Sequence, residues 1–275
     1  MAAYTEHTFS GTHVDINYAE SDGDGPALVI AHGFSGRWQG HIPYMDLLDD
    51  WHVYAVDQAG HGKSGTRDGT YKLVDFADDM AEFLEGVTGA GTAYIGLSLG
   101  GLVGMTVAGS HPELIKTLVT GDVPYLLFAE NYRGSWLHNY RADTREQLDV
   151  GIDVEAETKK QAEANPTWTQ EQARVQAVSL SQVRPETADA LADGTFADGW
   201  DTDSMFDRTT AAVFMLQGDD QNGGFKPDSD VTVMLERYSE AKAVKFYGLS
   251  HSLDYRSPDA PFSVLKNFLE ERHLA

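Results

Sequence analysis

Hydrophobic and polar residues follow two alternating patterns along most of the chain. Short apolar runs predict strands that are buried on both faces, and the segments between several of them have apolar positions at helical spacing. The predicted strands lie at 26–31, 51–57, 94–97, 114–119, 211–216 and 243–247, and the clearest helices at 76–87, 102–109 and 261–269. This alternation predicts an α/β fold with a mostly parallel central sheet flanked by helices. Residues 12–18 alternate singly between apolar and polar, which predicts an antiparallel hairpin at the sheet edge.

Residues 123–208 depart from this pattern because they contain no strand signal. Their helical segments are rich in Glu, Gln and Ala and are interrupted at Asn165-Pro166 and Arg184-Pro185. We therefore expect a core formed by residues 1–122 and 209–275, with 123–208 inserted as a helical cap or lid. Open α/β sheets bind ligands at the carboxyl ends of their strands, which is where such a cap would lie. An independent helical domain is the alternative interpretation of this segment.

Composition restricts the partners. The 275 residues include 43 Asp+Glu and 20 Lys+Arg, which gives a net charge of −23, and they include no cysteine. A chain this acidic repels nucleic-acid phosphates and anionic lipids, so we expect neither nucleic acid nor membrane as a partner. No leader and no apolar run of about 20 residues is visible, so a cytoplasmic location is expected. The missing cysteines exclude disulfides, thiolate metal sites and a cysteine nucleophile, and we expect no cofactor and no metal.

The most informative motif is Gly96-Leu97-Ser98-Leu99-Gly100-Gly101. It follows a predicted strand and precedes a predicted helix, which is the context of the G-x-S-x-G nucleophile elbow. This turn presents a serine hydroxyl to solvent, and small residues two positions on either side avoid collisions with the neighbouring strand and helix. Ser98 is therefore the candidate nucleophile.

Two further motifs could complete a catalytic site. His32-Gly33-Phe34 ends the first long strand, so the amide of Phe34 could join that of Leu99 in an oxyanion hole. Gly248-Leu249-Ser250-His251 follows the last strand, from which His251 could reach the nucleophile and exchange its proton. We interpret His32 and His61, which lies in a turn-rich loop, as structural.

Together, HGF, D-x-x-G-H-G-x-S, G-x-S-x-G-G and the late G-x-x-H resemble the α/β-hydrolase superfamily. The resemblance runs through nearly the whole chain outside 123–208. It implies an α/β-hydrolase fold with a nucleophile, an acid and a histidine, in that chain order. The motifs are specific for the superfamily, but they give almost no information about the substrate.

The acid is the least defined member. The family usually places it in a Gly-x-x-Asp loop after the strand that follows the cap, but here Gln221 holds that position. Asp219 or Asp220 could serve in a shortened loop. Some superfamily members, similar to N-formylmaleamate deformylase and the cofactor-free quinoline dioxygenases, take the acid from the position of Asp122, before the cap. We favour Asp122 and keep Asp219 and Asp220 as alternatives.

The leading functional hypothesis is a serine hydrolase that cleaves a small to medium carboxylic ester, lactone or amide through an acyl-enzyme. The resemblance leaves two alternatives open: a cofactor-free dioxygenase or perhydrolase/haloperoxidase-type enzyme, and a non-catalytic ligand-binding protein. Epoxide hydrolases and haloalkane dehalogenases on this scaffold carry Asp at the nucleophile position, so Ser98 argues against both.

The acidic composition favours a neutral acyl substrate. An anionic one would need a local arginine, such as Arg133 or Arg141. Aromatic residues that could line the substrate pocket are Tyr125, Phe128, Tyr132, Trp136 and Tyr140. The sequence does not indicate the oligomeric state.

Overall fold

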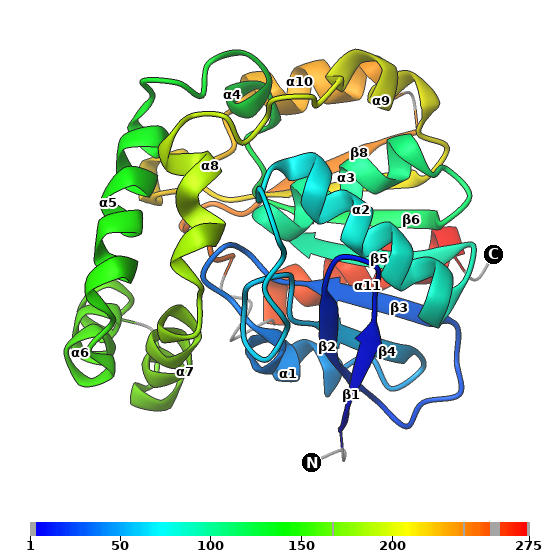
Figure 1. The fold of residues 1–275 in the computed structure, drawn as a ribbon. Helices are drawn as coiled ribbons and strands as arrows, with labels where there is room; N and C mark the ends of the chain where they lie inside the picture. Colours follow the sequence, from blue (N-terminus) through cyan, green and yellow to red (C-terminus); the bar gives the residue numbers. More distant parts are fainter. Residues whose placement is uncertain (1–3, 167, 239, 254–258, 274–275) are drawn as a thin grey trace.

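The computed structural model describes residues 4–166, 168–238, 240–253 and 259–273. Its centre is an eight-stranded sheet in the order β1-β2-β4-β3-β5-β6-β7-β8 (Figure 1). The strands are β1 Thr5–Ser10, β2 Asp15–Glu20, β3 Ala27–Ala31, β4 His52–Val56, β5 Thr92–Leu97, β6 Ile115–Gly121, β7 Ala212–Gln217 and β8 Lys242–Lys245. β1 and β2 form the antiparallel edge hairpin, β2 pairs antiparallel with β4, and all the other pairs are parallel.

Helices cover both faces of the sheet. One face carries α2 (Leu73–Phe83), α3 (Leu99–Ser110) and α10 (Asp228–Arg237), and the other carries α1 (Ile42–Met45) and α11 (Asp259–His273). The remaining helices belong to residues 123–208: α4 Tyr125–Glu130, α5 Trp136–Val150, α6 Val154–Ala164, α7 Gln170–Ser181, α8 Asp189–Ala192 and α9 Thr202–Arg208. Short helical turns are η1 Trp38–His41, η2 Leu84–Thr88, η3 Pro185–Ala188 and η4 Asp220–Asn222. The α/β architecture predicted from the sequence is confirmed.

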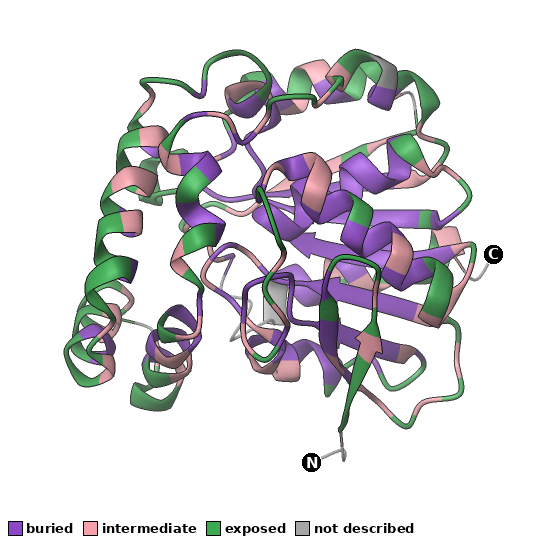
Figure 2. Cartoon of the chain, in the orientation of Figure 1, coloured by how far each residue is buried: buried purple, intermediate pink, exposed green. Residues whose placement is uncertain are grey.

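The central strand β3 is apolar at every position because successive side chains point to opposite faces of the sheet, and both faces are covered. In β3, Val29 and Ala31 join the core beneath α2 and α3, whereas Leu28 and Ile30 join the core beneath α11. Figure 2 shows the result: buried strands lie at the centre, and the exposed residues lie on the outer surfaces of the helices. The sheet therefore provides a rigid platform for the loops at its edges.

The predicted elements are found with small shifts at their ends. The helix expected at 102–109 begins earlier, at Leu99, directly after the serine of the elbow. The helix expected at 76–87 is α2, which is continued by the π-helical turn η2. The described residues of 123–208 form helices joined by loops, with no strand among them. α6 ends at Ala164, before Asn165-Pro166.

α5, α6, α7 and α8 lie beside the edge of the sheet where the parallel strands end (Figure 1). This edge carries the loops after β3, β5, β6 and β7. In the described part of the chain, no helix has the length and apolarity needed to cross a membrane.

Candidate active site

Ser98 lies in a sharp turn between β5 and α3. Its backbone has φ 49° and ψ −113°, a conformation that L-residues rarely adopt and that persists where the surroundings enforce it. The glycines around it are required by space. A Cβ added to Gly96 would lie 2.3 Å from the carbonyl oxygen of Gly100, and one added to Gly100 would lie 2.3 Å from that of Ala31. The G-x-S-x-G spacing is therefore a packing requirement of this turn.

The loop after β3 lies against this turn. A Cβ on Gly33 would lie 3.2 Å from the Cβ of Ser98, and the amide of Gly100 donates to the carbonyl of His32 (3.1 Å). Within the described residues, neither the amide of Phe34 nor that of Leu99 donates a hydrogen bond to the protein. Two unpaired amides next to a serine hydroxyl are what an oxyanion requires.

Asp122 and His251 are joined directly. Asp122 follows β6 and is fully buried, with φ 48°, and its Oδ2 accepts a 2.7 Å hydrogen bond from Nδ1 of His251. Backbone amides also donate to this carboxylate: Gly218 (2.8 Å) and Lys226 (3.3 Å) to Oδ1, and Phe225 (2.6 Å) to Oδ2. The carboxylate thus fixes the position of the imidazole and leaves Nε2 for the cavity.

The same contacts set the charge of Asp122. Burial by itself would raise its pKa, but the hydrogen bond from His251 and those from the amides of Phe225 and Gly218 outweigh burial and lower the pKa. Asp122 is therefore ionised at neutral pH and can stabilise a protonated imidazole.

Phe225 belongs to the candidate active site, although the sequence analysis did not identify it. Its ring stacks on the imidazole of His251, with centroids 3.7 Å apart and planes 14° from parallel, while its amide binds Asp122. Trp136, 54% exposed, also packs against the ring of Phe225, with centroids 4.8 Å apart in an edge-to-face arrangement. No motif points to this residue, because the loop that carries it is irregular and far from Ser98 in sequence.

The alternative acids make other contacts. The carboxylate of Asp219 accepts from the amides of Gly248 (2.9 Å) and Gln221 (3.1 Å) and from the side chain of Asn222 (2.7 Å). These bonds, led by that from Gly248, lower the pKa of Asp219. Asp220 is exposed and pairs with Lys245 at 2.8 Å. Asp219 therefore holds together the two loops on which Phe225 and His251 lie.

The histidines interpreted as structural are buried and bonded to the backbone. Nδ1 of His32 bonds the carbonyl of Gly33 (2.7 Å), and its Nε2 accepts from the amide of Gln58 (3.0 Å). His61 bonds the carbonyl of Phe34 through Nε2 (2.6 Å). Burial lowers the pKa of both rings, and their bonds to the backbone hold the loop that carries Phe34.

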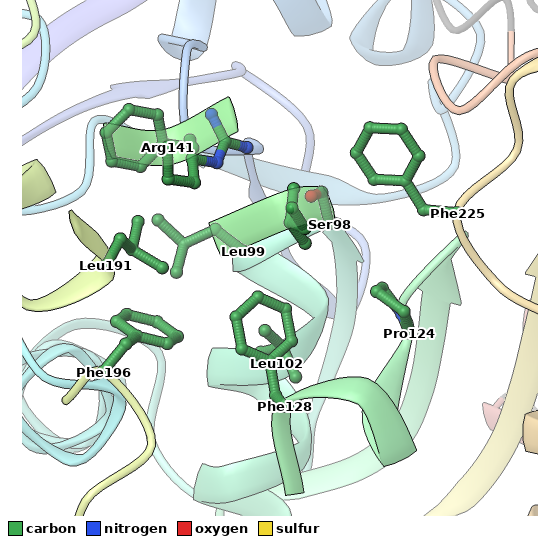
Figure 3. Close-up of a pocket in the computed structure, with 11 residues that line it drawn as sticks. Ser98, Leu99, Leu102, Pro124, Phe128, Arg141, Leu191, Phe196 and Phe225 are labelled. Carbon is green, nitrogen blue, oxygen red and sulfur yellow. The ribbon is translucent and has the colours of Figure 1, made fainter. Parts of the chain in front are cut away.

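Two cavities meet at Ser98. The inner cavity, with about 20 Å³ open to water, holds roughly one water molecule, and most of the side chains around it are apolar (Figure 3). It is lined by Phe34, Ser98, Leu99, Leu102, Pro124, Phe128, Leu137, Arg141, Leu191, Phe196 and Phe225. The outer cavity, of about 300 Å³, is lined by both Ser98 and His251 and by neutral polar side chains such as Ser35, Asn165 and Gln176. Its size lies at the lower end of the range for small-molecule sites.

The aromatic candidates from residues 123–208 divide between lining and core. Phe128 lines the inner cavity and Tyr140 the outer one, whereas Tyr125 and Tyr132 are buried and line neither. Trp136 lies at the surface against Phe225.

A group that could hold a metal occurs elsewhere in the described chain. Glu85, His111 and Glu113 can bring three ligand atoms within 4.8 Å of one another. The group lies beyond the C-terminal end of α3, opposite the end that begins at Leu99. Its carboxylates are exposed, and exposed acidic groups are common without a metal, so we assign it no role.

Comparison with known proteins agrees with the fold. A family model described as alpha/beta hydrolase fold matches residues 26–230. The 2-(acetamidomethylene)succinate hydrolase of Mesorhizobium japonicum is 32% identical over 115 residues, 41% of this chain and 41% of the relative. The 3-oxoadipate enol-lactonase 2 of Acinetobacter baylyi is 29% identical over 119 residues, 42% of this chain and 44% of the relative. Each match therefore spans less than half of the relative's length.

A solved structure matches over nearly the entire chain. The crystal structure of E-2-(acetamidomethylene)succinate hydrolase aligns with a TM-score of 0.76 and 21% identity, covering 98% of this chain and 100% of the other. At this level of identity the likeness shows the fold.

Proposed function

The chain belongs to the α/β-hydrolase fold family, and on this premise we propose that it is a serine hydrolase acting on a small acyl compound. The observation that carries the proposal is the meeting of three groups at one cavity. These groups are the strained Ser98, the pair of unpaired amides beside it, and the hydrogen-bonded His251 and Asp122.

In the proposed mechanism, Oγ of Ser98 attacks the substrate carbonyl while Nε2 of His251 takes the hydroxyl proton. The amides of Phe34 and Leu99 hold the oxyanion of the tetrahedral intermediate. The imidazolium then gives its proton to the leaving group, and an acyl-enzyme remains. Water attacks this ester, again with His251 as the base, and the acid product leaves. Asp122 keeps the imidazole in the required tautomer throughout, and no cofactor takes part.

The substrate class follows from the family and the cavity. Relatives are named as hydrolases of an acetamido compound and of an enol-lactone, and methyl ester esterases occur among them. We propose that this chain cleaves a carboxylic ester, lactone or amide small enough for a cavity of about 300 Å³.

We also propose that residues 123–208 act as a cap on a core made of 1–122 and 209–275. Arg141, Leu191 and Phe196 from this segment line the inner cavity together with Ser98 and Leu99 from the core. A substrate in this position would be enclosed by both parts, which limits water access during acyl transfer.

Turnover and labelling test the proposal together. With p-nitrophenyl acetate, Ser98→Ala and His251→Ala should each lose about 10³-fold or more in kcat while keeping the wild-type circular dichroism spectrum. A fluorophosphonate should modify Ser98 in the wild type and leave Ser98→Ala unmodified, as read by mass spectrometry of peptides. Ser250→Ala, a serine of the same cavity, is the control and should keep its activity. Wild-type turnover in Ser98→Ala would refute the mechanism.

A further inference from the structure

Arg141 places a positive charge at the proposed reaction centre. It comes from α5 and lines both cavities. Its guanidinium carbon lies 4.5 Å from the centroid of the Phe34 ring and 5.3 Å from that of Tyr140, so two aromatic rings support it. Figure 3 shows the guanidinium on the side of the cavity that faces Ser98.

This arginine has no carboxylate partner within the part of the chain that the structure describes. Arg145, one helical turn further along α5, pairs with two aspartates, and Arg133 pairs with Asp198 at 3.6 Å. Burial lowers the pKa of Arg141, partly offset by Tyr140 and Tyr132, yet a guanidinium stays protonated at neutral pH. A partly buried cation without an anion costs free energy, which an anionic ligand would recover.

The cavity walls exclude acidic residues. Of the 275 residues 43 are Asp or Glu, yet none of the described residues that line either cavity is acidic. Asp122 lies behind His251 and is already paired. Exposed charges elsewhere are screened beyond about 8 Å at physiological salt, so Arg141 dominates the potential inside the site.

We propose that Arg141 binds a carboxylate of the substrate, so that the compound cleaved at Ser98 carries a second, anionic group. The inference rests on the proposed function and names its substrate class. One planar guanidinium pairs with one carboxylate through two parallel hydrogen bonds, which also orients the molecule. The single unpaired cation among the described lining residues matches a single carboxylate. This replaces the neutral substrate that the overall charge had led us to expect.

A matched pair of esters tests the proposal. Monomethyl succinate and dimethyl succinate share one skeleton and differ by a negative charge, and proton release in a pH-stat follows both. The wild type should favour the monomethyl ester in kcat/KM by about tenfold or more. Arg141→Gln should abolish this preference, because kcat/KM should fall about tenfold more for the monomethyl ester than for dimethyl succinate. Arg133→Gln removes the same charge from an exposed, paired arginine and should keep the preference.

Arg141→Lys separates charge from shape. It keeps the cation but loses the planar fork, so its preference should lie between those of the wild type and Arg141→Gln. A wild type that favours dimethyl succinate, or an Arg141→Gln variant that slows both esters equally, would overturn the proposal.

Calorimetry measures carboxylate binding independently of ester hydrolysis. Monomethyl succinate is titrated into Ser98→Ala, which cannot turn it over, and into the same variant carrying Arg141→Gln or Arg133→Gln. Binding that weakens about tenfold only with Arg141→Gln supports the carboxylate site even if no ester is hydrolysed. If both esters are hydrolysed but binding does not depend on Arg141, the proposed hydrolase function is supported and the proposed carboxylate site is refuted.

Discussion

Replacing Asp122 by Asn tests the proposed catalytic acid with a minimal change in volume. The structure predicts the result from the hydrogen bonds around the carboxylate. Oδ1 accepts from the amides of Gly218 and Lys226, and Oδ2 accepts from the amide of Phe225 and from Nδ1 of His251. All four partners are donors in the proposed resting state, so the site requires two acceptor atoms.

An asparagine supplies one acceptor and one donor. Its oxygen should occupy the position of Oδ1, because two backbone amides point there and cannot move independently. Its NH₂ group then faces the amide of Phe225, which loses its acceptor, and His251, which must present Nδ1 as an acceptor and carry the proton on Nε2. In this tautomer Nε2 cannot take the proton of Ser98. In serine proteases, loss of the correct tautomer lowers kcat by about 10⁴-fold. We therefore expect kcat of Asp122→Asn to fall by about 10³- to 10⁴-fold.

The assay is steady-state hydrolysis of p-nitrophenyl acetate at pH 7.5, with circular dichroism as the folding check. Asp219→Asn and Asp220→Asn serve as matched controls and should stay within about tenfold of wild type, because their carboxylates bind loop amides and Lys245. An Asp122→Asn variant within tenfold of wild type would refute this reasoning. So would an Asp219→Asn variant that loses as much activity as Asp122→Asn.

Three further predictions concern Lys226, Phe225 and Leu191. Burial lowers the pKa of Lys226 to about 8, so below that pH the folded protein bears the full free-energy cost of burying this charge. The free energy of unfolding should rise as the pH increases from about 8 towards the pKa of an unfolded lysine, near 10.4. Urea titrations of Lys226→Met should lack this rise. Phe225→Leu removes the ring stacked on His251 but keeps the backbone amide, and kcat should fall about tenfold with KM nearly unchanged. Leu191→Ala enlarges the inner cavity, so the kcat/KM ratio of p-nitrophenyl butyrate to acetate should rise about tenfold, and an unchanged ratio would place the acyl chain elsewhere.

The fold could be predicted because its signals are local and repeated. Leu28 and Ile30 face one core and Val29 and Ala31 the other, so a strand buried on both faces must be apolar throughout, and this run is visible in the sequence. The first turn of α3 was missed because Gly100 and Gly101 carry no apolar periodicity, although the close approach of neighbouring backbone demands glycine there. Packing decided that boundary.

The proposed site was only partly visible in the sequence. Ser98 and Phe34 belong to short motifs whose spacing reflects backbone geometry, so residues within a few positions suffice to find them. The choice among Asp122, Asp219 and Asp220 depends on which carboxylate lies beside His251 after three loops have packed together. Each of these aspartates follows a strand, and their distances from His251 follow from tertiary structure.

The net charge favours a neutral substrate, whereas the proposed carboxylate site depends on the groups that line the cavity, among them Arg141. The charge of −23 is a sum over the whole chain, and most of the charged groups lie at the surface, where salt screens them. A ligand in the cavity experiences the groups that line it, and the described lining residues include a guanidinium and no carboxylate. An acidic exterior slows the approach of an anion, which lowers the association rate without weakening the contact made at the end. An enzyme of this kind should therefore bind its carboxylate substrate faster as ionic strength rises from low values, until salt begins to screen Arg141 itself.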